Sequence, residues 1–314
     1  MAGILPEAVL SDPCPILRRV EAETDPAGAG YVRADHLLPG YIASAVGYAS
    51  DYLQPTLHRG LPSAHLTFIF SLADPVISGR SPEQARGSDA LRNHVLVGGL
   101  HTGPAYIRPD EHQRGIQIAV HPLAARSLFG APARELGALV TDGPDLLGAE
   151  AERVRARMRE ASAWPARFTI LQEYLRGRVD ARPRRPERVR PELVEAWRWL
   201  AWHRGTGSMD GLAAHVHLSP RQLRTLFARE VGLGPKQVSR LMRFNHATSR
   251  IAYAVAGGAT PDLAGVAVQC GYFDHAHLDR DFAQFAGISP RGWIAEERRN
   301  IQDGGHRNGE TLAA

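Results

Sequence analysis

The sequence predicts an α+β protein of two domains: a small β-barrel or β-sandwich with trailing helices, then an all-α domain with two helix-turn-helix units. Its 314 residues are enough for two hydrophobic cores. Between Tyr31 and Val120, short apolar runs alternate with turn residues, which is typical of a compact β-structure. From Glu192 onward, apolar residues instead recur at helical spacing.

Four segments are predicted along the chain. Residues 1–178 form the first domain, beginning with a proline-broken arm over residues 1–25, and residues 192–299 form the second. Residues 179–191 combine arginine and proline without apolar periodicity, so we expect an extended, mobile linker there. Residues 300–314 are polar and glycine-containing, and we expect them to be a disordered tail.

Three apolar stretches of the first domain predict strands, over residues 65–72, 95–97 and 115–120. Turn residues at 61–63, 78–80 and 110–111 separate them. A short helix over residues 122–130 and then a pair of longer helices are expected to close the domain, and this pair is a candidate dimer contact. The apolar faces of the pair are Leu146, Leu147, Val154 and Met158 in one helix and Phe168, Leu171, Tyr174 and Leu175 in the other.

The first helix-turn-helix unit is predicted over residues 208–232. Leu212, Ala213 and Val216 lie on the inner face of its first helix. Ser219 and Pro220 begin the second helix as N-cap and first-turn proline. In such a unit the exposed start of the second helix contacts base edges. The side chains predicted to point outward there are Arg221, Gln222, Arg224 and Thr225.

The second unit is predicted over residues 262–293. Gly271 ends its first helix, where a positive φ suits a residue without Cβ. Asp274 caps the second helix, and Ser289 with Pro290 begins a third. The inward stripe of the second helix is Leu278, Phe282 and Phe285, and its outward set is His275, Ala276, Asp279 and Arg280.

A helical connector joins the two units over residues 235–255, opened by Pro235 and followed by glycines at 257 and 258. A helix of ~20 residues is ~30 Å long. Successive major grooves on one side of B-DNA are ~34 Å apart. The connector therefore has about the length that sets two helix-turn-helix units into successive grooves.

A long residue pattern runs through both units and the connector: Leu212, Ala213, Ser219, Arg221, Leu223, Phe227 and Gly232, then Pro235, Arg243 and Ala247, then Cys270, Gly271, Tyr272, Asp274, His277, Arg280, Phe282, Gly287, Ser289 and Pro290. In this pattern, residues 190–298 resemble the DNA-binding domain of AraC/XylS-type transcriptional regulators. Four positions depart from it: His217 replaces a glycine, Thr225 an arginine, Val238 an aromatic residue and Ala283 a lysine. The loss of two basic residues suggests weaker backbone affinity or an altered DNA site.

The first domain resembles, through fewer residues, the N-terminal domains of many AraC-type regulators. Residues 58–63 leading into the strand at 66–72 carry this resemblance, together with the strand and helix over 117–130. It implies a cupin-like barrel that binds a small-molecule effector or forms a homodimer. The effector, the oligomeric state, the operator sequence and the choice between activator and repressor stay open.

The resemblance implies a transcriptional regulator whose partner is double-stranded DNA, with RNA polymerase as a further candidate partner. Arginine suits guanine O6 and N7, so Arg221, Arg224 and Arg280 are the leading base-contact candidates. Asp279 either orients Arg280 or accepts from cytosine N4. Contacts to the DNA backbone are assigned to Ser219, Lys236 and Arg240. The alternative for each residue is a solvated surface side chain.

Composition agrees with a DNA-binding protein without requiring one. The net charge is +4 and the sequence pI is about 9.3. No apolar run approaches the ~18 residues of a membrane helix, and the N-terminus does not resemble a signal peptide. We therefore expect a cytoplasmic protein without a membrane partner.

The alternative function is a cupin-type metalloprotein enzyme fused to a DNA-binding domain. The first domain has histidines at 36, 58, 65, 94, 101, 112 and 121, but they lack ligand spacing with a downstream carboxylate. Cys14 stands alone in its domain, and Cys270 is expected to be a buried thiol of the second unit. No catalytic motif is recognisable, so we expect no enzyme activity, no metal and no cofactor.

Overall fold

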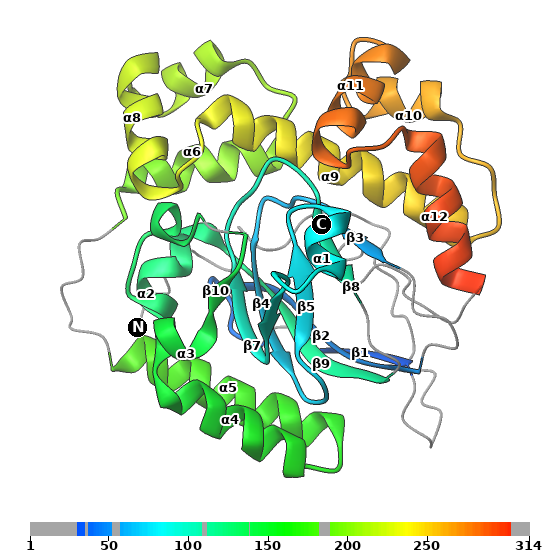
Figure 1. The fold of residues 1–314 in the computed structure, drawn as a ribbon. Helices are drawn as coiled ribbons and strands as arrows, with labels where there is room; N and C mark the ends of the chain where they lie inside the picture. The colour runs from blue at the N-terminus through cyan, green and yellow to red at the C-terminus, as the bar shows by residue number, and fades with distance from the viewer. Residues whose placement is uncertain are drawn as a thin grey trace.

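The structure, a computed structural model, describes residues 30–34, 37–51, 57–108, 112–137, 139–181 and 189–302. It confirms a β-rich N-terminal region with antiparallel sheets and a helical C-terminal region (Figure 1). The predicted N-terminal arm with Cys14, residues 182–188 of the predicted linker and residues 303–314 of the predicted tail lie outside the described residues.

The larger sheet has six antiparallel strands in the order β1-β2-β9-β4-β7-β10. Their bounds are Gly30–Ala34 (β1), Ile42–Asp51 (β2), His112–Val120 (β9), Leu66–Ser71 (β4), Val95–Gly98 (β7) and Thr141–Asp142 (β10). The three predicted strands are thus confirmed as β4, β7 and β9, with β9 longer than expected. Strand β2 was not predicted, because its run of alanine, serine and glycine has little apolar alternation.

The smaller sheet has the order β3-β8-β5-β6 and is also antiparallel. Its strands are His58–Gly60 (β3), Ala105–Arg108 (β8), Val76–Gly79 (β5) and Leu91–Asn93 (β6), and helix α1 (Pro82–Arg86) lies between β5 and β6. Residues 61–63 separate β3 from β4, as the turn prediction required. Because β3 and β8 lie next to the C-terminal helices, this sheet contributes to the contact between the two regions (Figure 1).

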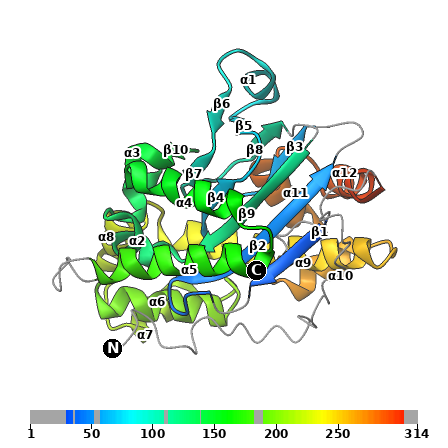
Figure 2. The ribbon, with the colours of Figure 1, turned by 90° about the horizontal axis from the view of Figure 1, so that it is seen from below.

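Helices cover the larger sheet after β9. They are η2 (Pro122–Ala124), α2 (Ala125–Phe129), η3 (Ala133–Leu136), α3 (Gly143–Leu147), α4 (Ala149–Glu160) and α5 (Trp164–Asp180). The single helix expected over residues 146–158 is wrong: Gly148, at φ +73°, divides it into α3 and α4. Figure 2 shows α4 and α5 side by side along the sheet. Phe70 of β4 meets Tyr174 of α5 edge to face, at 6.3 Å between ring centroids.

The C-terminal region is entirely helical. Its helices are α6 (Pro191–Trp202), α7 (Met209–His215), α8 (Pro220–Glu230), α9 (Pro235–Ala256), α10 (Leu263–Gln269), α11 (His275–Phe285) and α12 (Pro290–Gln302). The first unit therefore comprises α7 and α8, the second comprises α10 and α11, and the connector is α9. Residues 300–302, expected in the tail, instead belong to α12.

The two units differ in how their cores relate to the first domain. The core of the first unit is continuous with that of the β-rich region. Trp197 of α6 joins the two: its ring lies 5.2 Å from that of His121 and 6.4 Å from that of Phe227 of α8. The second unit and α12 have a separate core, to which the first domain adds only the partly buried Leu61 among the described residues.

Candidate nucleic-acid interface

The first unit begins its second helix with a complete capping box. The Ser219 hydroxyl accepts from the backbone N–H of Gln222, and the Gln222 side chain accepts from the backbone N–H of Ser219. His217, in the turn, has φ +54°, the left-handed conformation for which glycine is the ordinary residue. The predicted departure at 217 therefore places a side chain at a position that favours glycine.

The four outward residues predicted for this helix are all exposed. Gln222 is held in the capping box, and the Thr225 hydroxyl donates to the carbonyl of Arg221 at 3.0 Å. The guanidinium groups of Arg221 and Arg224 have no hydrogen bond or ion pair to another described residue. These two cations are thus exposed at the tip of α8 while Leu223 and Phe227 fix its opposite face in the core.

The second unit confirms the expected turn and cap. Gly271 has φ +74°, and Cys270 before it is fully buried. Asp274 accepts a hydrogen bond from the backbone N–H of His277 at 2.7 Å, which caps α11. Burial raises the pKa of the Cys270 thiol to about 11, so it is an unreactive core residue as expected.

The outward set of the second unit is partly engaged within α11 itself. Nε2 of His275 lies 3.4 Å from a carboxylate oxygen of Asp279. Arg280 is exposed, and its Nε donates to the carbonyl of Ala276 at 3.2 Å. Asp279 therefore lies beside His275, and its expected contact with Arg280 or with cytosine N4 stays a prediction. Ala276 is exposed next to this pair.

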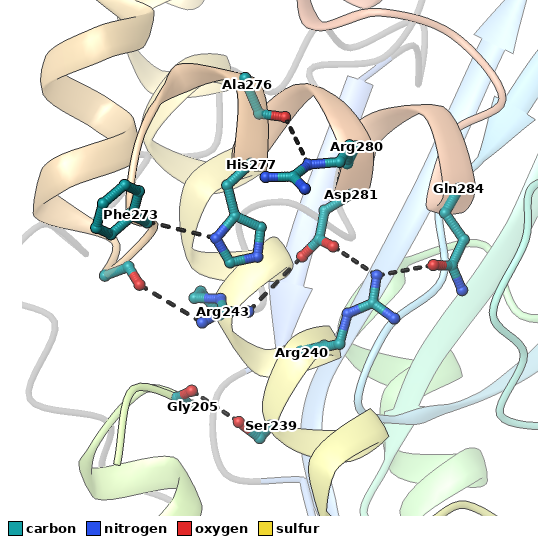
Figure 3. Close-up of polar contacts among 11 residues, drawn as sticks. Gly205, Ser239, Arg240, Arg243, Phe273, Ala276, His277, Arg280, Asp281 and Gln284 are labelled. Carbon is teal, nitrogen blue, oxygen red and sulfur yellow. Dashed lines mark hydrogen bonds and ion pairs between the residues drawn. The ribbon is translucent and has the colours of Figure 1, made fainter. Parts of the chain in front are cut away.

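A buried carboxylate attaches α11 to the connector. Asp281 is 1% exposed, and it accepts from Arg240 of α9 at 2.6 Å while Arg243 lies 4.0 Å away (Figure 3). Arg240 also donates to Gln284 at 2.7 Å. This cluster was not predicted, although the spacing of Asp281 from Leu278 places an acidic residue on the inward stripe of α11.

The connector is also attached to the first unit. The hydroxyl of Ser239, on α9, donates to the carbonyl of Gly205 in the loop after α6 at 2.7 Å. Gly205 has φ +72°, and a Cβ there would lie 2.0 Å from the backbone oxygen of Ser239, so only glycine fits. With 22 residues, α9 is about 33 Å long. It is thus a helix of defined length fixed to both units.

The second helix of each unit ends against the first domain. Glu230, the last residue of α8, accepts from Arg126 of α2 at 2.6 and 3.0 Å. At the end of α11, the carbonyl of Ala286 accepts from Arg59 of β3 at 2.9 Å. The N-terminal tip of each helix is the end opposite to this contact. Figure 1 shows both helices on one side of the β-rich region.

The three residues assigned to the DNA backbone are placed differently. Ser219 is the exposed N-cap of α8, and Lys236 is exposed in the first turn of α9 without a side-chain partner among the described residues. Arg240 is instead held by Asp281 and Gln284 and lies over the Phe285 ring at 5.0 Å. Through these contacts Arg240 joins α9 to α11, and its phosphate contact stays a prediction.

Three histidines of the first domain, His58, His65 and His121, have strongly lowered pKa values, and His121 is buried. Burial lowers the pKa of His58 and of His65 to about 4 and that of His121 to about 3, so all three are neutral near pH 7. Nδ1 of His121 accepts from the backbone N–H of Leu123 at 3.1 Å. Over the described residues, no group of three or more His, Cys, Asp or Glu side chains is placed to hold a metal ion.

These features define a class of protein: two helix-turn-helix units on one connecting helix, beside a β-rich domain. Comparison with protein families matches residues 212–296 to a family described as "Helix-turn-helix domain". Residues 212–296 are therefore an AraC-type helix-turn-helix domain. A search of curated proteins gave no match.

Solved structures with a similar course of the chain include ToxT from Vibrio cholerae O395, at 10% identity and a TM-score of 0.45, covering 80% of this chain and 96% of that one. Wild-type ToxT from V. cholerae strain SCE256 bound to an unsaturated fatty acid matches at 9% identity and a TM-score of 0.44, covering 80% of this chain and 94% of that one. The AraC-like transcriptional activator CuxR matches at 13% identity and a TM-score of 0.24, covering 73% of this chain and 88% of that one. With TM-scores this low, the family rests on the domain match. In the part of the chain that is described, no helix is long and apolar enough to cross a membrane.

Proposed function

We propose that the protein binds a specific operator by placing the N-terminal tips of α8 and α11 in successive major grooves of one duplex. The observation that carries this proposal is that α8 and α11 both end against the first domain, which leaves exposed residues at the opposite, N-terminal end of each helix. Helix α9, at about 33 Å, matches the ~34 Å groove repeat.

In this arrangement the first unit supplies the stronger base contacts. Arg221 and Arg224 are exposed and unpaired among the described residues, so each can donate two N–H groups to guanine O6 and N7. In the second unit Arg280 is the corresponding cation. Ser219, Lys236 and the N-terminal amides of α8 and α9 lie where phosphate contacts are expected.

The first domain is proposed to control this binding through a small-molecule effector or through homodimerisation. Support comes from its direct contacts with the helical region. One is the Arg126–Glu230 pair at the end of α8, and two others reach α12 and α9. Arg59 of β3 pairs with both carboxylate oxygens of Glu296 at 3.1 Å, and Asn245 of α9 accepts from the N–H of Ala64 at 3.0 Å. A change in β3 or β4 would therefore reach the second unit. The cupin-like class of the domain, a contact with RNA polymerase and a cytoplasmic location belong to the same proposal.

The test begins with a duplex selected from a random pool by the purified full-length protein. Footprinting should show a site of ~20 bp, and log K should fall steeply with log salt because phosphate neutralisation releases counterions. Arg221→Ala and Arg280→Ala should each cost about 1–3 kcal/mol and relax selectivity only at their own base pairs.

Arg92→Ala is the matched control, because it removes the same charge from an exposed position on β6 of the first domain. It should leave both affinity and selectivity unchanged. If Arg221→Ala and Arg280→Ala weaken binding to selected and random DNA equally, these residues do not contact bases. If the protein enriches no sequence at all, the proposed function is wrong.

A further inference from the structure

One aromatic side chain of the second unit is almost completely exposed. The Phe273 side chain is 90% exposed, whereas the other large exposed hydrophobic residues described range from Leu91 at 37% to Trp202 at 74%. Exposing an apolar ring of this size to water is unfavourable, and an aromatic residue in this state marks a contact site when it lies on a functional surface. Phe273 immediately precedes the cap of α11, so it lies at the tip of the proposed recognition helix.

Hydrogen bonds hold Phe273 in place. Its backbone N–H donates to Nδ1 of His277 at 3.4 Å (Figure 3). The backbone N–H of His277 donates in turn to Asp274 at 2.7 Å. Burial and the nearby Arg243 lower the pKa of His277, which keeps Nδ1 available as an acceptor at neutral pH. Tyr272, on the other side, is 4% exposed and packs against the His277 ring. The Phe273 backbone is therefore fixed between a buried residue and a helix cap.

The tip of α11 also differs in chemistry from that of α8. Ala276, three residues after Phe273, is exposed as well, so the start of α11 presents an apolar pair. The nearest polar side chains, His275 and Asp279, lie against each other at 3.4 Å. Helix α8 instead presents two arginines at its start. The two tips are thus suited to different base edges.

We infer that Phe273, with Ala276 beside it, is a specificity-determining contact for the 5-methyl group of thymine. In the major groove only thymine presents a methyl group, and alanine and phenylalanine are among the side chains that contact it. A rigidly held apolar pair at the start of a recognition helix would bury that methyl and leave cytosine, which lacks it, without a contact. This inference rests on the proposed placement of α11 in a major groove.

The test uses the duplex selected by the full-length protein and replaces each thymine in turn by uracil, which removes only the methyl group. At one or two thymines of one half-site, uracil should weaken binding of the unchanged protein about four-fold, the ratio that corresponds to ~0.8 kcal/mol for one buried methyl or methylene group. Fluorescence anisotropy at a fixed salt concentration gives the ratio of Kd values.

Three variants connect this effect to the side chain. Phe273→Ala should bring the uracil-to-thymine ratio of Kd at those positions to about one, and Phe273→Leu should retain most of the effect because it remains apolar. Tyr253→Ala removes another exposed aromatic ring, 61% exposed on α9, and should leave the ratio unchanged. Since Phe273 is exposed, thermal unfolding of its variants should match that of the parent.

The outcomes separate the two proposals. A selected site whose affinity is insensitive to uracil at every thymine overturns the inference and leaves the proposed function standing. A uracil effect of equal size in the parent and in Phe273→Ala also overturns it, because another group then contacts the methyl. Failure to select any site overturns both.

Discussion

Replacing Asp281 by alanine tests how the second unit is held together. This carboxylate is 1% exposed and lies between two guanidinium groups of α9, so its removal leaves Arg240 and Arg243 close together without their anion. The buried hydroxyl of Tyr272 is nearby, and its pKa is raised first by burial and then by the charge of Asp281. We expect a large loss of stability confined to α9, α11 and their neighbours.

The magnitude follows from the exposure of the partners. Removing one member of a buried ion pair costs about 3–5 kcal/mol when the other stays uncompensated. Here the arginine side chains are 28% and 14% exposed, and Arg240 keeps Gln284 as an acceptor. Solvent and this second partner offset part of the loss. We therefore expect Asp281→Ala to lower the free energy of unfolding of the second unit by about 2–3 kcal/mol.

Native-state hydrogen exchange measures this locally, because it assigns opening free energies to individual helices. Protection should fall in α11 and α12 and stay unchanged in β4 and β9. Asp279→Ala, on the same helix at a half-exposed position, is the control and should change protection by no more than about 0.5 kcal/mol. In a double-mutant cycle with Arg240→Ala, the double variant should lose about 1–2 kcal/mol less stability than the sum of the losses of the two single variants. A loss below ~0.5 kcal/mol in α11, or equal loss in the first domain, would refute this account of the cluster.

Two further predictions concern stability. His217→Gly should raise the free energy of unfolding by about 0.5–1 kcal/mol in chemical denaturation, because φ +54° disfavours a side chain, whereas Ala214→Gly in the preceding helix should lower it by about 1 kcal/mol. Equal effects of the two changes would contradict the backbone argument. Burial, with a smaller effect of Glu296, raises the pKa of Glu297 from 4.5 to about 8. Between these pH values the folded state therefore holds a proton that the unfolded state has lost. The free energy of unfolding falls as pH rises through this range. Glu297→Gln should remove a decline of ~2 kcal/mol between pH 6.5 and 8, and an unchanged pH profile would show that this carboxyl is not held protonated.

The second domain was predictable in detail because its signals are local. Proline at the start of α9 and glycine after it predicted a helix over residues 235–255, and the structure has Pro235–Ala256. Ser219 and Asp274 are the caps that their sequence positions predicted. Such signals act over three or four residues, so one sequence is enough to recognise them.

Features that depend on distant partners were not predictable in the same way. The pairing of Asp281 with Arg240 joins residues on two helices, and only the acidic residue on an apolar stripe hinted at it. Arg59 lies 237 residues from its partner Glu296, and nothing near it in the sequence marks it as an interdomain contact. The 90% exposure of Phe273 likewise depends on the packing of neighbouring elements, which the sequence around it does not indicate.

The two units are attached to the first domain with unequal strength. The first shares an apolar core with it through Trp197, and each fully buried side chain of that kind contributes about 1.5–3 kcal/mol. The second is attached mainly by Arg59 and Asn245, whose contacts are partly exposed and polar. Ion pairs that solvent reaches contribute about 0–1 kcal/mol each. Separating the second unit from the first domain therefore requires far less free energy than separating the first. An effector acts by binding one arrangement of the two domains more tightly than another. Such an effector would change the position of α11 while α8 stays fixed. Its effect on DNA affinity would therefore be largest at the half-site that α11 contacts.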